Sequence, residues 1–382
     1  MTIEGRLVGI VAGEASGDFL GASLIAALRK RRPDLRFAGI GGPAMQAQGC
    51  ESWYPMERLA VRGYVEVLKQ YWGLVSMRRE LGNRLLRERP ALVIGVDAPD
   101  FNLDLEARMR RAGIRTLHYV SPSIWAWRGG RIKRIAQAVD HMLTLFPFEE
   151  DIYRKAGIPA TFVGHPLADI IPEKDQTSLA REQLRIPVGR PIVALLPGSR
   201  QSELRYMANI FIKTARLMEK RQPGMRFLVP MINRETRNIF EAALYEEDAA
   251  DLPLTLLFGH ARDAIAASDA VLVASGTATL EVGLYRKPMV IAYRMSPTTW
   301  RIMSRMRYQP WVGLPNIILR RFLVPELLQD DATPENLAQA LMNVMTDPVI
   351  RERLPRHLAA LHESLKRGAG ERAAEAALQC MS

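Results

Sequence analysis

One carboxylate stands directly after an apolar segment, in a place that suits a general base. Asp97 follows the run Ala91–Val96 and precedes Ala98, Pro99 and Asp100. Pro99 fixes its own φ and favours an extended conformation for Ala98. A carboxylate at the carboxyl end of a central parallel strand points toward a ligand cleft, where it can accept a proton. We therefore assign the base role to Asp97 and a helix-capping role to Asp100.

A second loop with carboxylates follows the first apolar run. In Gly13–Asp18, the glycines let the backbone approach a ligand and Ser16 is placed to cap a helix. Glu14 and Asp18 are poor choices for a cap alone, so we expect Glu14, Ser16 and Asp18 to contribute to a binding site; a capped turn is the alternative. Gly39–Ala44 resembles a dinucleotide fingerprint but follows the second strand and contains a proline, so we interpret it as a turn.

Two loops in the second half are suited to a phosphate or diphosphate. In the first, Gly198 permits close backbone approach, Ser199 is a potential cap, and Arg200 offers a planar fork for phosphate oxygens. An ordinary capped turn with a surface arginine is the alternative reading of this loop.

The other loop is small and rich in hydroxyl groups. Ser275, Gly276 and Thr277 lead into a helix start and leave room for a diphosphate. Glu281 lies one turn later, where its carboxylate could accept hydrogen bonds from ribose hydroxyls. One such loop is a weak signal, but two in one half favour a nucleotide site.

Aromatic and basic residues gather in the segment His118–Arg128, after another apolar run. His118, Trp125 and Trp127 suit an amphipathic ligand, although an aromatic pair in the core is almost equally plausible. His165 ends a further strand, and we interpret it as a turn histidine with a satisfied ring.

Two stretches mix large apolar side chains with arginine, as interfacial helices do. A buried helix with solvated arginines is the alternative for each stretch alone, and the presence of two favours a membrane-facing edge. The stretches are Tyr64–Arg79, with Tyr71 and Trp72, and Thr299–Arg307, with Trp300, Arg301 and Arg305.

Composition indicates a globular protein. The chain has 382 residues, of which 48% are hydrophobic and 24% charged, which excludes disorder and a disulfide scaffold as its main character. The net charge of +11 suits acidic partners or plain solubility. Cys50 and Cys380 have no zinc-type spacing and favour a reducing compartment. No apolar run reaches the roughly 20 residues of a membrane span, and the N-terminus does not resemble a signal peptide.

Short apolar runs alternate with amphipathic segments, which predicts an α/β fold with parallel, doubly wound sheets. The pattern predicts a domain over residues 1–168, a junction over 169–190, a second domain over 191–350, and C-terminal helices over 351–382 that either stay with the second domain, return to the first or exchange between subunits. The predicted strands are Leu7–Ala12, Arg36–Gly39, Ala91–Val96, Thr116–Val120, Met142–Leu145, Ala160–Val163, Ile192–Leu196, Phe227–Val229, Leu254–Phe258, Ala270–Val273 and Met289–Ala292.

Taken together, these motifs resemble the lipid A disaccharide synthase family of inverting glycosyltransferases, whose GT-B fold has two Rossmann-like domains facing a central cleft. The resemblance runs in order along nearly the whole chain. It rests on Gly13–Asp18, Gly95–Asn102, His118–Arg128, Leu195–Arg200, Ala274–Glu281 and Leu314–Asn316.

The resemblance implies a reaction between two acylated sugars. UDP-2,3-diacylglucosamine is the donor, and the 6-hydroxyl of 2,3-diacylglucosamine 1-phosphate attacks its anomeric carbon to form a β-1′,6 linkage and release UDP. It implies metal-independent catalysis without a cofactor, at the cytoplasmic face of the inner membrane, in a peripheral protein that could form oligomers. Asn233 and Asn316 become candidates for nucleotide contacts by this resemblance alone.

Two alternative functions remain open from the sequence. A UDP-sugar 2-epimerase or another UDP-sugar transferase would share the loop Ser275–Glu281 but would not need the apolar-basic stretches. A nucleotide- or nucleic-acid-binding protein without enzymatic activity would fit the positive charge, but the basic residues are scattered and lack interleaved aromatics, so we expect no nucleic-acid partner.

Overall fold

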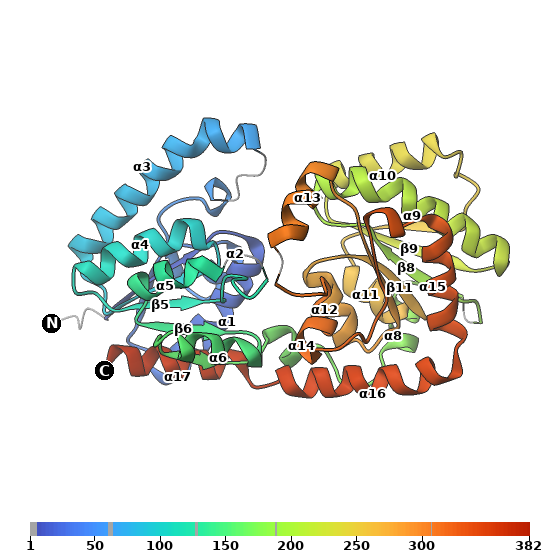
Figure 1. The fold of residues 1–382 in the computed structure, drawn as a ribbon. Coiled ribbons are helices and arrows are strands. Elements are labelled where there is room, and N and C mark those ends of the chain that lie inside the picture. Colours follow the sequence, from blue (N-terminus) through green and yellow to red (C-terminus); the bar gives the residue numbers. More distant parts are fainter. Residues whose placement is uncertain (1–5, 60–63, 127–128, 188, 307) are drawn as a thin grey trace. The chain divides into compact units, whose positions relative to one another are not determined.

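The computed structural model describes residues 6–59, 64–126, 129–187, 189–306 and 308–382; the side chains of residues 64–71, 298, 302, 305 and 306 lie outside the description. The chain forms two compact units (Figure 1). The first contains the residues up to Asp169 together with Leu365–Ser382, and the second contains Ile170–Ser364. The chain thus enters the second unit once and then returns to the first.

The described part of the first unit is a parallel sheet of seven strands in the order β3-β2-β1-β4-β5-β6-β7. Helices connect the strands, and α17 packs against α1. The elements are β1 (Leu7–Ala12), α1 (Ala15–Arg31), β2 (Arg36–Ile40), α2 (Pro43–Ala47), β3 (Cys50–Ser52), η1 (Met56–Arg58), α3 (Tyr64–Glu88), β4 (Leu92–Val96), α4 (Pro99–Arg111), β5 (Thr116–Tyr119), η2 (Gly129–Arg131), α5 (Ile132–Ala138), β6 (His141–Thr144), α6 (Pro147–Lys155), β7 (Ala160–Phe162), α7 (Pro166–Ile170) and α17 (Ala369–Met381).

The described part of the second unit repeats the arrangement with six parallel strands in the order β10-β9-β8-β11-β12-β13. Its elements are α8 (Thr177–Gln183), β8 (Ile192–Leu196), α9 (Gln201–Arg221), β9 (Arg226–Met231), α10 (Arg234–Glu246), β10 (Leu254–Phe258), α11 (Ala261–Ala267), β11 (Ala270–Ala274), α12 (Thr277–Leu284), β12 (Met289–Tyr293), α13 (Pro297–Met306), α14 (Leu314–Leu319), β13 (Glu326–Leu328), η3 (Gln329–Asp331), α15 (Pro334–Thr346) and α16 (Pro348–Leu365).

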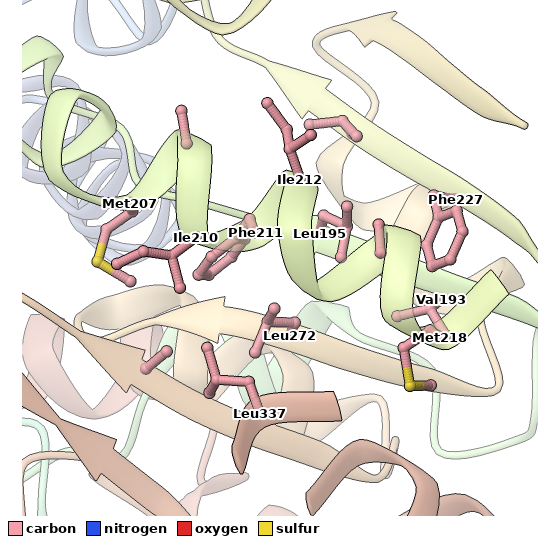
Figure 2. Packing of buried hydrophobic residues seen from close by; sticks show 14 of the residues in the cluster. Val193, Leu195, Met207, Ile210, Phe211, Ile212, Met218, Phe227, Leu272 and Leu337 are labelled. Carbon is pink, nitrogen blue, oxygen red and sulfur yellow. The ribbon is translucent and has the colours of Figure 1, made fainter. Parts of the chain in front are cut away.

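The core of the second unit forms where α9 lies on its sheet. Figure 2 shows Phe211 of this helix among the buried side chains of Leu195 in β8 and Leu272 in β11. Each fully buried side chain of this size contributes about 1.5–3 kcal/mol relative to an exposed one. The central strands β8, β9, β11 and β12 are buried on both faces, which explains why they appear in the sequence as continuous apolar runs.

Both sheets reverse their strand order beside the first strand. In the first unit, β1 pairs with β2 on one side and with β4 on the other. In the second unit, β8 pairs likewise with β9 and β11. Such a switch point leaves a crevice at the carboxyl ends of the two central strands, where ligands bind in this class of fold. The loops after β1, β4, β8 and β11 are those that the sequence singled out.

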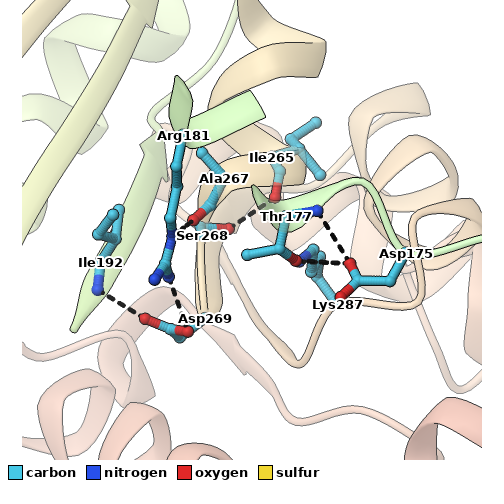
Figure 3. A network of polar contacts seen from close by, with 9 residues as sticks. All are labelled: Asp175, Thr177, Arg181, Ile192, Ile265, Ala267, Ser268, Asp269 and Lys287. Carbon is cyan, nitrogen blue, oxygen red and sulfur yellow. Dashed lines mark hydrogen bonds and ion pairs between the residues drawn. The ribbon is translucent and has the colours of Figure 1, made fainter. Parts of the chain in front are cut away.

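The segment that enters the second unit is fastened by polar contacts (Figure 3). Arg181 of α8 donates to the carbonyl of Ala267 at 2.8 Å and to Asp269 at 2.9 Å, and Asp269 also accepts from the backbone N–H of Ile192 at 2.8 Å. Lys287 is buried, which lowers its pKa, and donates to Thr177 at 2.6 Å. Within the stretch expected to be a junction, α8 is therefore an integral helix of the second unit.

Two short edge strands were not predicted. β3 and β13 each have three residues, and each carries a glutamate, Glu51 or Glu326. They extend the two sheets by pairing with β2 and β12. Cys50 at the start of β3 is buried, which raises the pKa of its thiol to about 12, and both cysteines are free.

Candidate active site

The two loops at the first switch point touch each other. A Cβ on Gly13, after β1, would lie 2.8 Å from the Cβ of Ala98, after β4. A Cβ on Gly17 would lie 3.3 Å from the carbonyl oxygen of Val96. These glycines let the start of α1 approach the end of β4. As a result, the charge of Glu14 acts on the carboxyl of Asp97.

Asp97 is held in an unusual backbone conformation. Its φ is +54° and that of Ala98 is +45°, both in the left-handed region that non-glycine residues seldom adopt. Three contacts fix them: Asp97 N–H donates to the Tyr119 carbonyl at 2.8 Å, Asn102 Nδ2 donates to the Asp97 carbonyl at 2.8 Å, and Ala98 accepts the first bonds of α4. The prediction that Pro99 makes Ala98 extended is wrong, because these bonds override the local preference.

The surroundings of Asp97 act on its charge in opposite directions. Partial burial of the carboxyl raises its pKa, the ring of His118 lowers it, and the charge of Glu14 raises it again. The net effect is a raised pKa, which makes Asp97 a stronger base than an exposed aspartate. Glu14 and Ser16 are exposed beside it. Ser16 does not cap α1, because Glu14 occupies the N-cap position and makes no side-chain cap.

Asp18 has a structural role that its position in the loop did not predict. Its side chain is buried and accepts from the backbone N–H groups of Gly42 at 2.9 Å, Ala44 at 2.9 Å and Met45 at 3.0 Å. A Cβ on Gly42 would lie 2.6 Å from the Asp18 carboxylate. Asp18 therefore caps α2 and does not face a sugar, since its oxygens are occupied. Gly42 of the dinucleotide-like motif serves this contact.

His118 is also buried, contrary to its predicted place at the acceptor site. Its Nδ1 lies 2.8 Å from Glu106 Oε1, and both side chains are 0% exposed. Desolvation lowers the pKa of His118, but the charge and hydrogen bond of Glu106, together with the charge of Asp97, give a net rise. Glu106 was not predicted, and nothing in its local sequence distinguishes it from a surface glutamate of α4. Asp100 does not cap α4, whose N-cap is Ala98, but binds Arg131 at 2.6 Å.

Trp125 is half-buried and belongs to an aromatic cluster. It packs edge-to-face on Phe146 and Phe148, and its Nε1 donates to Glu149 Oε1 at 2.9 Å. Glu149 is buried, which raises its pKa to about 7, despite hydrogen bonds that stabilise its charge. Trp127 and Arg128 of the same motif lie outside the described residues. His165 is buried and stacks on Phe146, and burial lowers its pKa to about 4.

In the second unit, the loop after β8 presents Arg200 to solvent. Its side chain is 61% exposed and contacts Glu203 at 3.5 Å. Glu203 also accepts from the N–H groups of Ser199 and Arg200 at 3.2 and 3.3 Å. Gly198 has a φ of +125°, and a Cβ there would lie 2.8 Å from Glu203. Ser199 is not the cap that we predicted; a glutamate three residues into a helix is a readable capping signal that we missed.

The loop after β11 is open at its glycine. No described atom lies within 4 Å of a Cβ on Gly276, whose φ is +145°, and Gly276 and Thr277 are exposed at the start of α12. Ser275 donates to the Val312 carbonyl at 3.2 Å. Glu281 accepts from Arg262 Nε at 2.8 Å, and its side chain is 20% exposed. Arg262, on α11, was not predicted, because it lies 19 residues away in the sequence.

The two asparagines have structural partners. Asn233 is the N-cap of α10 and accepts from Thr236 N at 2.9 Å. Asn316 is 0% exposed, and its side chain donates to the Val324 carbonyl and Glu326 and accepts from the N–H groups of Leu323 and Val324. An amide offers two donors and two acceptor positions. All are used in Asn316, so it shapes the loop rather than binding a nucleotide.

The two apolar-basic stretches are helices, α3 and α13. Trp72 of α3 is 76% exposed, Trp300 of α13 is half-buried and Arg301 is exposed. The side chains of Tyr71 and Arg305 lie outside the described residues. In the part of the chain that the structure describes, no helix is both long and apolar enough to cross a bilayer.

The sequence matches a family of known proteins along nearly its whole length. The model of the lipid-A-disaccharide synthetase family matches residues 8–377. The lipid-A-disaccharide synthase of Methylobacillus flagellatus is 54% identical over 371 residues, which are 97% of this chain and 98% of the relative. That of Azoarcus sp. strain BH72 is 55% identical over 375 residues, which are 98% and 96% of the two chains.

Solved structures support the fold. UDP-GlcNAc 2-epimerase from Neisseria meningitidis, bound to UDP-GlcNAc, has a TM-score of 0.65 at 10% identity and covers 98% of this chain and 99% of its own. MurG of Acinetobacter baumannii has a TM-score of 0.58 at 14% identity and the same coverage. At such identity the likeness concerns the fold alone. It confirms the predicted GT-B type with two Rossmann-like domains.

Proposed function

The chain belongs to the lipid-A-disaccharide synthase family, and from this premise we propose how its residues divide the reaction. The chain is an inverting glycosyltransferase of lipid A biosynthesis, which joins UDP-2,3-diacylglucosamine to 2,3-diacylglucosamine 1-phosphate. The alternative of an epimerase is not favoured, because epimerases match at 10% identity and synthases at 54% and 55%.

Asp97 is the general base of this proposal. A sugar hydroxyl is a weak nucleophile, so its proton must pass to a positioned base as the C–O bond forms. Asp97 takes the proton of the acceptor 6-hydroxyl while that oxygen attacks the anomeric carbon, and the bond from this carbon to UDP breaks. The observation that carries the assignment is the place of Asp97 beside the switch point. Its backbone is fixed at φ +54°, and partial burial raises the pKa of its carboxyl.

Arg200 and nearby backbone N–H groups stabilise the departing diphosphate. Arg200 is mostly exposed and is held by one contact of 3.5 Å, so its guanidinium is available to phosphate oxygens. Gly276 and Thr277 place peptide N–H groups at the start of α12, where anions are favoured. Gly198 allows close backbone approach at the start of α9, where the N–H of Ser199 would exchange its contact with Glu203 for a phosphate oxygen. In this proposal, these positive groups stabilise the charge of the departing diphosphate, which in other enzymes a metal ion stabilises. We expect full turnover in EDTA, and restoration of a lost rate by Mg²⁺ would contradict this.

The remaining site residues are assigned to ribose binding and to the acceptor side. Glu281 accepts from the ribose hydroxyls, with Arg262 holding its carboxylate at 2.8 Å. Asn233 caps α10 beside the nucleotide loops, and Ser275 anchors the loop of Gly276 through the Val312 carbonyl. Glu14, Ser16 and Trp125 contribute to the acceptor side, because they are exposed or half-buried on loops of the first unit.

We also propose that the protein binds the cytoplasmic face of an anionic inner membrane. The 76% exposure of Trp72, on a helix rich in arginine, supports this assignment. Trp72→Glu should weaken co-sedimentation with phosphatidylglycerol-containing vesicles, while Tyr245→Glu, at an aromatic of the second unit that is 89% exposed, should leave it unchanged. Equal binding of Trp72→Glu and the wild type would remove α3 from the membrane contact.

Turnover and nucleotide binding, measured separately, test the catalytic assignment. Asp97→Ala should abolish formation of the disaccharide and retain the affinity for UDP, because the base acts on the acceptor. Arg200→Ala should lose about 10²-fold in kcat, as does deletion of one preorganised electrostatic stabiliser. Asp104→Ala and Arg205→Ala are matched controls on α4 and α9. Wild-type turnover by Asp97→Ala would refute the base role, and an unchanged rate in Arg200→Ala would refute its role.

A further inference from the structure

The mechanism leaves one buried ionisable pair without a role. Glu106 and His118 are both 0% exposed, and their side chains meet at 2.8 Å. Glu106 lies on α4 and His118 on β5, so the pair joins the two elements on either side of the segment that carries Asp97.

Backbone pairing places this pair directly against the end of β4. His118 is the register partner of Gly95, two residues before Asp97. A Cβ on Gly95 would lie 2.1 Å from Glu106 Oε1 and 2.8 Å from the Cβ of Asn102. Glu106 and Asn102 are one helical turn apart, so the same face of α4 contacts Gly95 with both. Asn102 holds the Asp97 carbonyl, and Glu106 holds the His118 ring.

Stability does not account for the pair. Removing two charges from water costs several kcal/mol per ion, which a buried pair recovers only when its remaining polar atoms are also satisfied. In the described part of the chain, Glu106 Oε2 and His118 Nε2 have no hydrogen-bond partner. An apolar pair of similar volume would therefore fold at least as well.

The charges around Asp97 indicate what the pair does. Glu14 from the loop after β1 and His118 from β5 both act on the Asp97 carboxyl: Glu14 raises its pKa and His118 lowers it. Both Glu106 and Asp97 raise the pKa of His118. His118 is thus the cation that opposes burial and Glu14 at this carboxylate, and Glu106 is the anion that retains its proton.

We propose that Glu106 and His118 are positioning residues for the base: Glu106 keeps the buried His118 ring charged against the end of β4, and this imidazolium keeps Asp97 ionised and ready for the acceptor hydroxyl. The inference rests on the proposed base role of Asp97. No bond is made or broken in the pair; its effect is electrostatic.

The pH profile of kcat/KM tests the proposal. Asp97 must be ionised to act, so turnover rises with pH through its titration. Removing the imidazolium in His118→Gln, or its anion in Glu106→Gln, should move this acidic limb upward by about one pH unit. The rate below the limb should then fall about tenfold, while the rates converge with the wild type at high pH. His141→Gln, at the start of the neighbouring strand β6, changes a histidine whose ring contacts Thr161 rather than Glu106. It is the matched control and should leave the limb in place.

Two spectroscopic titrations make the result independent of activity. The ¹³Cγ signal of Asp97, assigned with Asp97→Asn, should titrate at higher pH in both variants. In the wild type, the ¹⁵N signals of His118 should report a protonated ring at pH 7. A neutral ring, or a limb that stays in place while the rate falls equally at every pH, would overturn the proposal. If His118→Gln fails to fold, the isosteric Glu106→Gln and the wild-type titration decide. Full turnover by Asp97→Ala would refute the base role alone, and the two titrations would still test the pair.

Discussion

Replacing Asp18 by asparagine separates a structural role from a substrate-binding role. The carboxylate accepts three backbone N–H groups, two at Oδ1 and one at Oδ2, at 2.9–3.0 Å. Asparagine keeps one oxygen, but its NH₂ group meets the N–H of Ala44 donor to donor. The two remaining bonds lose their charge assistance.

The structure allows an estimate of the loss. The N–H of Ala44 is only partly buried, so leaving it unpaired costs about 1 kcal/mol, the low end of the range for a buried donor; the two bonds that become neutral lose roughly 1 kcal/mol each. We expect the free energy of unfolding of the first unit to fall by about 3 kcal/mol. For a unit of this size, 1 kcal/mol lowers Tm by about 2–4 °C, so the first thermal transition should move down by about 6–12 °C.

Thermal unfolding followed by circular dichroism, with hydrogen exchange at the amides of Gly42, Ala44 and Met45, measures the effect. Asp104→Asn, whose partly exposed carboxylate forms surface ion pairs on α4, is the control and should cost about 1 kcal/mol or less. Below the transition, KM for the acceptor should match the wild type. A variant with wild-type Tm but a raised acceptor KM would refute the capping assignment and return Asp18 to the substrate site.

Two further changes have defined outcomes. Burial raises the pKa of Glu149 from an ordinary 4.5 to about 7, so folding favours its protonated form: the contribution of this group to stability is fully present below about pH 4.5 and is lost as the pH rises to 7. Glu149→Gln should remove this fall, roughly 3 kcal/mol, measured as the difference in unfolding free energy from the wild type at pH 5 and 8; parallel curves would contradict it. Asn316→Ala should lower unfolding stability by about 3 kcal/mol, because it leaves buried backbone groups unpaired, with UDP affinity by calorimetry unchanged; a stable variant with weakened UDP binding would contradict its structural role.

The sequence predicted the central sheets well for a physical reason. Strands buried on both faces must be apolar at every position, and their loops are marked by the glycines and polar residues that follow. The predicted apolar runs ending at Ala12, Val96, Leu196 and Val273 therefore located both switch points. The edge strands β3 and β13 were missed because they are three residues long and carry charge.

The roles of individual polar residues were less predictable. Glu14 is the N-cap of α1 and Asp18 lies in the first turn of the same helix, yet Asp18 is buried and Glu14 is exposed. The difference depends on Gly42, which lies 24 residues from Asp18 in the sequence. The partners of His118 and Glu281 are likewise set by packing between helices and strands. Glu203 and Glu149 had a local signal, since each is the third residue of a helix, and Asn233 had one as a typical N-cap residue.

The return of the chain to its first unit has a consequence for synthesis on the ribosome. Helix α1 packs against α17, whereas residues 170–364 lie between them in the chain and form the second unit. A domain folds as it emerges when its own contacts are complete. The second unit meets this condition earlier, while the nascent first sheet waits, with the apolar surface of α1 uncovered, until residues 365–382 leave the exit tunnel. The first unit, which is synthesised first, thus completes its folding last. During that interval a chaperone could bind the uncovered apolar surface of α1.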